Sequence, residues 1–165
     1  MTEYTFREKL TQYKNTVFRL AVGYTKNIQD AEDITQDVFL KLYCNEKEFE
    51  SDEHEKAWLI RVTVNLCKNH LKTSWMRLRS PQSEYDSNTA FYDESNIEMM
   101  EMLSKVKPDY RVLLYLFYYE QYKTYEIAKI LKRNENTVRT QLKRAREQLR
   151  LLMLEERGEL YEYKV

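Results

Sequence analysis

Four basic side chains recur at helical spacing near the end of the chain: Arg139, Lys143, Arg146 and Arg150. Steps of four, three and four residues place them on one face of a helix, and we call them the basic row. Such a row suits the phosphates of a nucleic acid, and a guanidinium group can also form paired hydrogen bonds with guanine. The alternative is a solvated surface without a ligand. The residue types and their spacing predict a DNA-binding helix.

The helix that carries the basic row needs a core to pack against. Val138, Leu142, Ala145 and Leu149 repeat with the same steps one position earlier, which is typical of a buried helical face. A shorter apolar helix precedes them, and only residues 132–136 separate the two patterns. Because such a short connection forces a tight turn, this segment predicts a helix-turn-helix.

Charge is divided unevenly along the chain. Lys plus Arg and Asp plus Glu both number 27, which excludes a globally basic nucleic-acid binder. Residues 129–150 hold eight basic and two acidic side chains, a local net charge of +6, whereas residues 81–100 hold five acids and no base. Local charge steers a phosphate backbone, so DNA binding by electrostatics is expected in the C-terminal part.

Composition and periodicity predict an all-α protein. The chain has only two glycines and two prolines, too few for the tight turns of a many-stranded sheet. Apolar residues keep a helical period in three early segments, near 6–24, 30–43 and 55–72. We predict two small helical domains over 1–79 and 97–155, joined by a flexible acidic linker over 80–96 and followed by a charged tail over 156–165.

The third of these segments carries both an apolar and a polar row. Leu59, Val62 and Leu66 are expected to face the core. A second face combines basic and amide side chains, namely Arg61, Asn65, Lys68 and Lys72. These could be ordinary surface residues or contacts for a nucleic-acid strand.

Two features before this helix have equally open interpretations. Asp30, Asp33 and Asp37 form an outer acidic strip, which would suit a basic partner but is also favourable near a helix N-terminus. A polar stretch over 45–55 contains Phe49 as its only large apolar residue. We expect an ordered loop in which Phe49 is either an anchor or a reader of a ligand.

Catalytic and metal chemistry find little support. Cys67 and His70 could form half of a metal site, but Cys44 and His54 are distant and no second ligand pair has zinc spacing. A Cys-His nucleophile fits by spacing, yet nothing supplies an oxyanion site. We therefore expect two core cysteines, no metal, no cofactor and no enzymatic activity. No apolar run reaches the roughly 20 residues of a membrane span, so we expect no membrane insertion and a cytoplasmic location.

Three segments in series resemble the extracytoplasmic-function (ECF) sigma factors, the smallest class of the sigma-70 family of bacterial RNA polymerase. Residues 30–39 (DAEDITQDVF) resemble the family's core-binding helix, and residues 57–69 (AWLIRVTVNLCKN) its −10 reading helix. The segments EIAKIL at 126–131 and TVRTQLKRAR at 137–146 resemble its −35 reading motif. Many regulators contain one helix-turn-helix, but three such segments in this order indicate a sigma factor.

The resemblance implies a role for each set of polar residues. Contacts with the clamp helices of the largest polymerase subunit would come from Asp33, Gln36 and Asp37. The melted −10 strand would be held by a base-capturing loop and an amide-lined helix, through Phe49, Arg61, Asn65 and Asn69. The −35 element would meet Arg139, Thr140, Lys143 and Arg144 in the major groove, with Arg146 near phosphates.

The resemblance also implies partners: core RNA polymerase, promoter DNA and an anti-sigma factor that masks the exposed surfaces. The competing interpretation is a helix-turn-helix regulator that does not replace the sigma subunit. Binding to core polymerase with start-specific transcription would favour the sigma factor, whereas tight operator binding without polymerase would favour the regulator.

Local departures from the family pattern affect the helix-turn-helix. The usual Gly and Ser that open it are Gln121 and Lys123, so Thr124 is expected to cap the first helix instead. A usual Gly in the turn is Asn136, which is expected to take a left-handed conformation.

Overall fold

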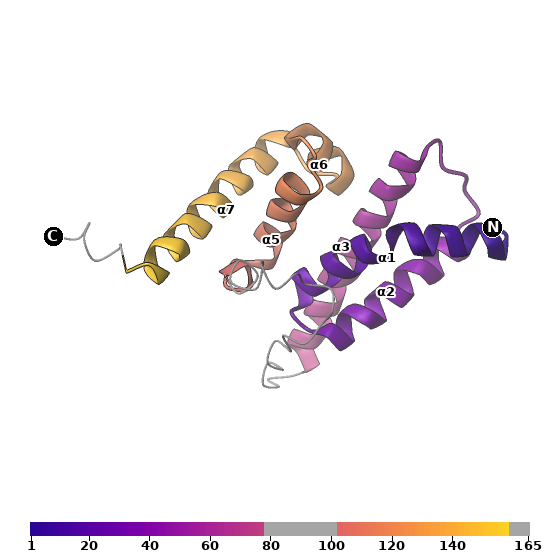
Figure 1. The fold of residues 1–165 in the computed structure, drawn as a ribbon, viewed down its shortest axis with the longest axis horizontal. Coiled ribbons are helices and arrows are strands. Elements are labelled where there is room, and N and C mark those ends of the chain that lie inside the picture. The colour runs from indigo at the N-terminus through magenta and orange to yellow at the C-terminus, as the bar shows by residue number, and fades with distance from the viewer. Residues whose placement is uncertain (78–101, 159–165) are drawn as a thin grey trace. The chain divides into compact units, whose positions relative to one another are not determined.

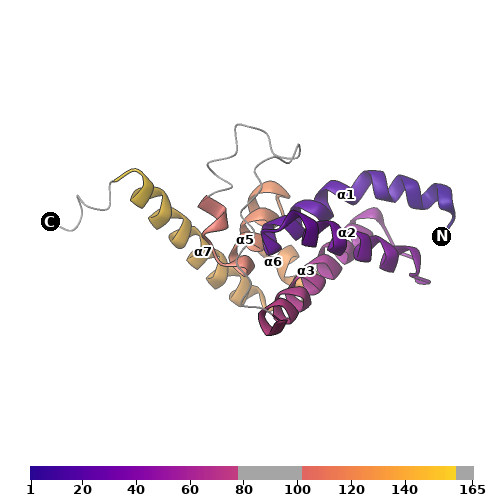
Figure 2. The ribbon, with the colours of Figure 1, turned by 90° about the horizontal axis from the view of Figure 1, so that it is seen from below.

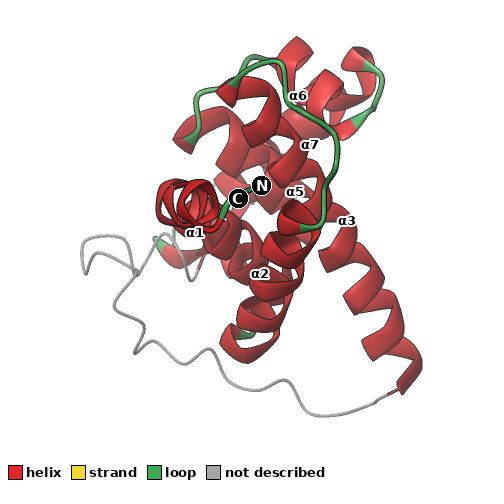
Figure 3. Cartoon of the chain, turned by 90° about the vertical axis from the view of Figure 1, so that its right-hand side faces the viewer, coloured by secondary structure: helices red, strands yellow, loops and turns green. Residues whose placement is uncertain are grey.

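The structure is a computed structural model that describes residues 1–77 and 102–158, without the side chains of residues 74–77. Regular structure in these ranges is entirely helical, as Figure 3 shows, and the all-α prediction is confirmed. The chain divides into two compact units, Met1–Asp86 and Ser87–Val165. The predicted linker over 80–96 lies outside the described residues, so its boundaries remain a prediction. Within the described ranges, no helix has both the length and the apolar character needed to cross a bilayer.

Three long helices form the first unit: α1 (Glu3–Thr25), α2 (Ile28–Tyr43) and α3 (Asp52–Arg77). Each packs against the other two, as Figures 1 and 2 show. Apolar side chains from all three fill the centre, and Val17, Leu42, Leu59 and Ile60 are fully buried. The unit therefore has its own core, and one outward face of each helix remains free for function.

The connection between α1 and α2 is tight because both helix ends are satisfied locally. Lys26 takes a left-handed conformation with φ of 55° and its N–H returns to the Val22 carbonyl oxygen. The next residue, Asn27, accepts a hydrogen bond from the Asp30 N–H at 3.0 Å and caps α2. The two helices thus turn back on each other within two residues.

A cluster of three charged side chains joins α1 to the start of α3. Lys9 Nζ lies 2.6 Å from Glu55 Oε2 and 2.8 Å from Asp52 Oδ1. The Glu55 side chain is only 4% exposed, so Lys9 neutralises a carboxylate that has lost its water. The hydrogen bonds to Asp52 and Glu55 raise the pKa of Lys9 above its ordinary value.

The buried face of α3 differs from the sequence prediction. The helix begins at Asp52, before the predicted start near 55, and Val62 and Leu66 are only partly buried. The buried positions of α3 besides Leu59 and the charged Glu55 are Ile60, Thr63, Val64 and Cys67. The buried face is wider than predicted because α1 and α2 both cover it. Thr63 can be buried there because its hydroxyl donates to the Leu59 carbonyl oxygen at 2.7 Å.

The second unit contains α5 (Pro108–Leu114), the single π-helical turn η2 (Tyr115–Tyr119), α6 (Thr124–Leu131) and α7 (Glu135–Glu156). Pro108 occupies the first turn of α5, where the missing N–H costs nothing. Both α5 and α6 pack on α7. The fully buried residues include Leu113, Leu116, Ile127 and Leu142.

The turn between α6 and α7 confirms the helix-turn-helix but corrects two details. Lys132, with φ of 53°, supplies the left-handed residue, whereas Asn136 lies within α7. Thr124 does not cap α6; the Glu126 carboxylate accepts from the Lys123 N–H at 2.7 Å instead. Both predictions placed the special residue by analogy with a motif, whereas the local hydrogen bonds decide where each helix begins and ends.

Candidate nucleic-acid interface

The outward face of α7 presents the residues predicted to read the −35 element. Arg139, Thr140, Lys143, Arg144 and Arg146 are all exposed. On the opposite face Val138, Leu142 and Ala145 are buried, as predicted, whereas Leu149 is only partly buried. A well-anchored helix thus holds a basic surface outward, which is the arrangement that a recognition helix requires.

An acidic residue that sequence reasoning did not single out lies at the first position of α7. Glu135 Oε1 lies 2.7 Å from Arg139 Nη2 and accepts a hydrogen bond from Thr124 Oγ1 at 3.2 Å. The Glu135 side chain therefore joins the start of α6 to the basic face of α7. Its spacing of four residues before Arg139 is the signal that could have revealed the pair.

Aromatic side chains of η2 hold one member of the basic row. Arg146 Cζ lies 5.0 Å from the centroid of the Phe117 ring and 5.8 Å from that of Tyr118. The two rings are themselves edge to face, with centroids 5.0 Å apart. The sequence pattern did not predict this contact, because it depends on how η2 packs beside α7.

One basic residue of the helix-turn-helix serves the fold rather than the surface. The Arg133 side chain is 18% exposed; it donates to Gln141 Oε1 at 3.2 Å and pairs with Asp109 Oδ1 at 3.4 Å. The local charge of +6 counted from the sequence therefore overstates the charge presented to DNA. Arg133 instead ties the turn to α5 and α7.

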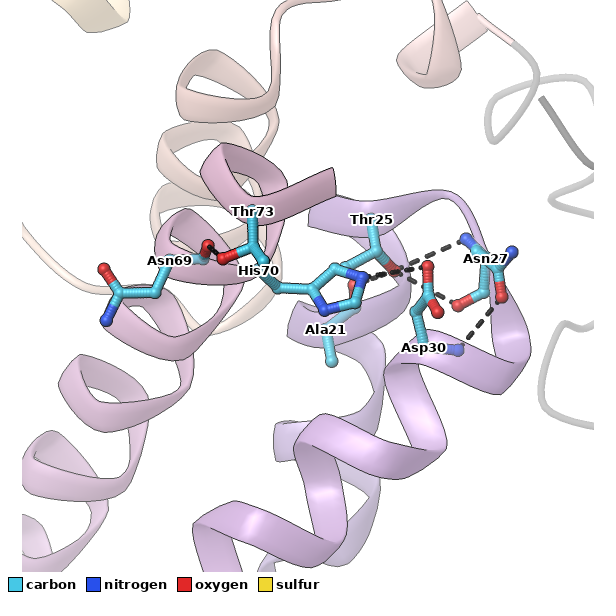
Figure 4. Close-up of polar contacts among 7 residues, drawn as sticks. All are labelled: Ala21, Thr25, Asn27, Asp30, Asn69, His70 and Thr73. Carbon is cyan, nitrogen blue, oxygen red and sulfur yellow. Dashed lines mark hydrogen bonds and ion pairs between the residues drawn. The ribbon is translucent and has the colours of Figure 1, made fainter. Parts of the chain in front are cut away.

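The polar face of α3 presents amides to solvent. Asn65 and Asn69 are exposed and Arg61 is partly exposed. Figure 4 shows the amide of Asn69 pointing away from the neighbouring His70, whose ring reaches toward α2. His70 Nε2 lies 3.0 Å from Asp30 Oδ2, so this contact joins α3 to α2 while Asn69 stays outside.

The acidic strip on α2 is shorter than expected from the sequence. Asp30 is half-buried and engaged with His70, so it does not belong to the open surface. Asp33, Gln36 and Asp37 are exposed, whereas Ile34 and Val38 are buried. Gln36 and Asp37 follow Asp33 by three and four residues, which places all three on one face of α2. These three are the residues predicted to meet polymerase.

Phe49 is packed within the loop between α2 and α3. Its ring centroid lies 5.5 Å from that of Trp58 and 5.6 Å from that of His54, and Phe49 is partly buried. The Glu50 N–H donates to His54 Nδ1 at 3.3 Å, which fixes the imidazole beside the ring. The anchor interpretation of Phe49 therefore has a structural basis, and its role toward a base stays a prediction.

The cysteines differ from each other. Cys67 is buried, and burial raises the pKa of its thiol to about 12. Cys44 is exposed at the end of α2, so the prediction that both are core residues was wrong for Cys44.

Among the residues that the structure describes, His, Cys, Asp and Glu side chains nowhere form a group of three or more that could hold a metal ion.

Comparison with known families accounts for both units. Residues 10–77 match the family profile described as sigma-70 region 2, and residues 96–149 match sigma-70 region 4. The chain belongs to the ECF sigma factors of the sigma-70 family. Similar relatives are the RNA polymerase sigma factor SigV (29% identical, 89% of this chain and 90% of the relative) and the ECF RNA polymerase sigma factor SigW (26%, 88% and 87%), both from Bacillus subtilis.

Solved structures show the same fold. The sigma factor RpoE of Bartonella quintana, crystallised with the anti-sigma factor NepR, aligns with a TM-score of 0.71 at 19% identity, over 90% of this chain and 96% of that one. CnrH, solved with the cytosolic domain of CnrY, aligns with a TM-score of 0.66 at 19% identity, over 92% and 89%. The sigma factor thus has the two-unit fold expected from its sequence.

Proposed function

We propose that this sigma factor docks on core RNA polymerase through α2 and reads promoter DNA with α3 and α7. The observation that carries this proposal is the basic face of α7, which is exposed opposite a buried apolar face. A neutral chain cannot bind DNA through its overall charge, so this local surface has to provide the contact. Each unit then contributes one end of the promoter contact.

The α2 surface suits docking on a protein rather than on DNA. Asp33 and Asp37 would repel phosphates, and with Gln36 between them they offer acceptors to a basic surface such as the polymerase clamp helices.

The α3 surface suits a melted strand. Asn65 and Asn69 present donors and acceptors to base edges, and Arg61 adds a positive charge along the same face. Phe49 would either stack on a captured base or hold the loop shape that captures it. Its contacts with Trp58 and His54 support the second role directly.

The α7 surface suits duplex DNA. Four exposed residues would enter the major groove: Arg139, Thr140, Lys143 and Arg144. Arg146 would contact a phosphate. Base contacts by arginine would supply sequence preference, whereas the phosphate contacts would position the helix.

A regulatory partner is also expected. Both solved structures contain a further protein. In the RpoE structure, that protein is the anti-sigma factor NepR. We propose that an anti-sigma factor covers the exposed α2 or α7 surface of this chain. We assign no catalytic role, and we expect the protein to act in the cytoplasm, where polymerase and DNA meet.

The test is transcription by core polymerase reconstituted with the full chain, on a promoter found by mapping transcript starts after induced expression. Start-specific transcripts that depend on the chain are expected. Tight operator binding by the chain alone, with no association with core polymerase, would favour the regulator instead.

The −10 assignment is tested on the same promoter by permanganate footprinting. Asn65→Ala and Phe49→Ala should reduce reactivity of the melted thymines, because strand capture stabilises the open complex. Asn15→Ala removes an exposed amide from α1 and serves as the matched control. Unchanged melting in both variants would contradict the assignment.

A further inference from the structure

Glu135 places a negative charge at the end of α7 that is expected to meet base edges. Recognition helices of this kind contact bases with their N-terminal residues, and Glu135 is the first residue of α7. A carboxylate there repels the phosphates on either side and so weakens binding to any DNA. Its presence within a basic surface calls for an explanation other than affinity.

The contacts of Glu135 show what the carboxylate does in the free protein. Thr124 Oγ1 holds Oε1 from one side at 3.2 Å, and Arg139 Nη2 lies 2.7 Å from the same oxygen. Thr124 is the first residue of α6, so the carboxylate is fixed to both helices of the helix-turn-helix. The Arg139 side chain remains 61% exposed despite this bond, and much of its guanidinium can still reach a ligand.

A fixed guanidinium is better suited to base reading than a free one. Bidentate recognition of guanine needs two N–H groups in one plane and one direction, and a flexible arginine loses side-chain entropy when it adopts that orientation. A carboxylate bonded at Nη2 restricts the orientation before DNA arrives. The same carboxylate disfavours sequences that give Arg139 no guanine, because only the repulsion then remains.

We propose that Glu135 is a positioning residue that sets −35 specificity: it orients Arg139 toward one guanine and lowers binding to DNA without it. This inference rests on the proposed reading of DNA by α7. An ordinary surface pair at this spacing would only support the helix. The additional bond from Thr124, which belongs to another helix, is what distinguishes Glu135 from such a pair.

The test selects DNA with polymerase holoenzyme containing the full chain, from duplexes randomised over the −10 and −35 regions. The wild type should prefer guanine at one −35 position by about 10-fold or more. Glu135→Gln keeps the size of the side chain but removes its charge. It should reduce this preference to about 3-fold or less and increase binding to unselected duplexes by about 2-fold.

Glu147→Gln is the matched control, because Glu147 forms a similar exposed pair on the same helix, 2.7 Å from Arg150. It should increase binding to unselected duplexes without changing the −35 preference. An unchanged preference in Glu135→Gln, or an equal loss in both variants, would overturn the role of Glu135.

Arg139→Ala separates this inference from the proposed function. Loss of the guanine preference in Arg139→Ala but not in Glu135→Gln would leave α7 as the reader and refute only the positioning role. If Arg139→Ala changed neither binding nor preference while core binding persisted, Arg139 would not be a reader and the positioning role would fail. Loss of promoter binding in Arg144→Glu would then still support α7 as the reader, whereas unchanged binding in both variants would refute the proposed function of this face.

Discussion

Arg146 extends from α7 over the ring of Phe117, with Cζ 5.0 Å from the ring centroid. The ring attracts the positive charge of the guanidinium and restricts where the Arg146 side chain can point. An arginine held in this way can meet a phosphate in one orientation. The rings of η2 therefore belong functionally to the α7 surface.

Replacing the ring should weaken promoter binding without changing the charge. Phe117→Leu keeps an apolar side chain but removes a contact worth about 0.5–1 kcal/mol, so holoenzyme should bind promoter DNA about 2- to 5-fold more weakly. The slope of log affinity against log salt should stay constant, whereas Arg146→Ala should reduce it by about 0.9. Equal slopes in both variants would refute a phosphate contact by Arg146. Equilibrium binding at several salt concentrations measures both quantities.

The buried Glu55 should make the first unit sensitive to its lysine. Lys9→Met removes the partner of a carboxylate that is 4% exposed, and we expect the free energy of unfolding to fall by about 3 kcal/mol. Asp52→Asn removes only the exposed contact of Lys9, since the Asp52 side chain is 69% exposed. The free energy of unfolding should then fall by at most about 1 kcal/mol.

Tryptophan fluorescence during urea unfolding measures this difference, because both tryptophans precede residue 86. Since the pKa of Lys9 is raised in the folded state, its contribution is complete at neutral pH and is lost only as pH rises through that value. A loss near pH 7 would contradict this explanation.

Glycine at the left-handed turn should stabilise the second unit. Lys132 takes φ of 53° and ψ of 49°, a conformation that costs a residue with a side chain about 1 kcal/mol. Lys132→Gly should therefore increase stability by about 0.5–1 kcal/mol. Lys129→Gly, inside α6, should instead lose about 1 kcal/mol. Thermal unfolding followed by circular dichroism measures both, and a loss in Lys132→Gly would show that its side chain contributes more than the strain costs.

Charge reversal should separate the two surfaces. Asp37→Lys should weaken binding to core polymerase several-fold, because an acid that faces a basic surface becomes a repelling base. Arg144→Glu should weaken promoter binding by holoenzyme while core binding stays intact. Native gel titration with core polymerase and filter binding with promoter DNA measure the two steps. Equal loss of both steps in one variant would indicate misfolding or a wrong assignment.

The two cysteines should react at very different rates. Cys44 is exposed, whereas Cys67 is buried and the pKa of its thiol is raised to about 12. A thiol reagent at pH 8 should modify one cysteine rapidly in the native protein and the second only after denaturation. Cys44→Ser should abolish the rapid phase. Rapid modification of Cys67 would show that α3 opens readily.

Periodicity predicted the helices and the faces that carry the proposed site, because both depend on spacing alone. Asp33 and Asp37 on α2, and Lys143 on α7, lie outside as their positions in the pattern require. The buried face of α3 was predicted less well. An apolar face could be drawn through Val62 or through Ile60, and only the packing of α1 and α2 shows that the buried face contains Ile60.

Contacts between segments distant in the sequence could not be predicted in this way. His70 reaches Asp30 across forty residues, and Arg133 reaches Asp109 across 24. Such pairs depend on how the helices pack against one another. From the sequence alone, we therefore assigned Asp30 to an exposed acidic strip and counted Arg133 among the basic residues available to DNA. The helix ends were also not predicted correctly, because Lys132 rather than Asn136 takes the left-handed conformation.

The contact between His70 and Asp30 has a consequence for where transcription starts. Asp30 lies on the helix proposed to dock on polymerase, and the neighbour of His70 is Asn69, proposed to hold the melted strand (Figure 4). If both proposals hold, a captured base is fixed relative to the enzyme through one turn of α3 and one contact to α2. The distance from the −10 element to the first transcribed nucleotide would then depend on the rigidity of protein packing rather than on the stiffness of the DNA. Loosening the α2 and α3 contact would broaden the choice of start position while leaving promoter choice unchanged.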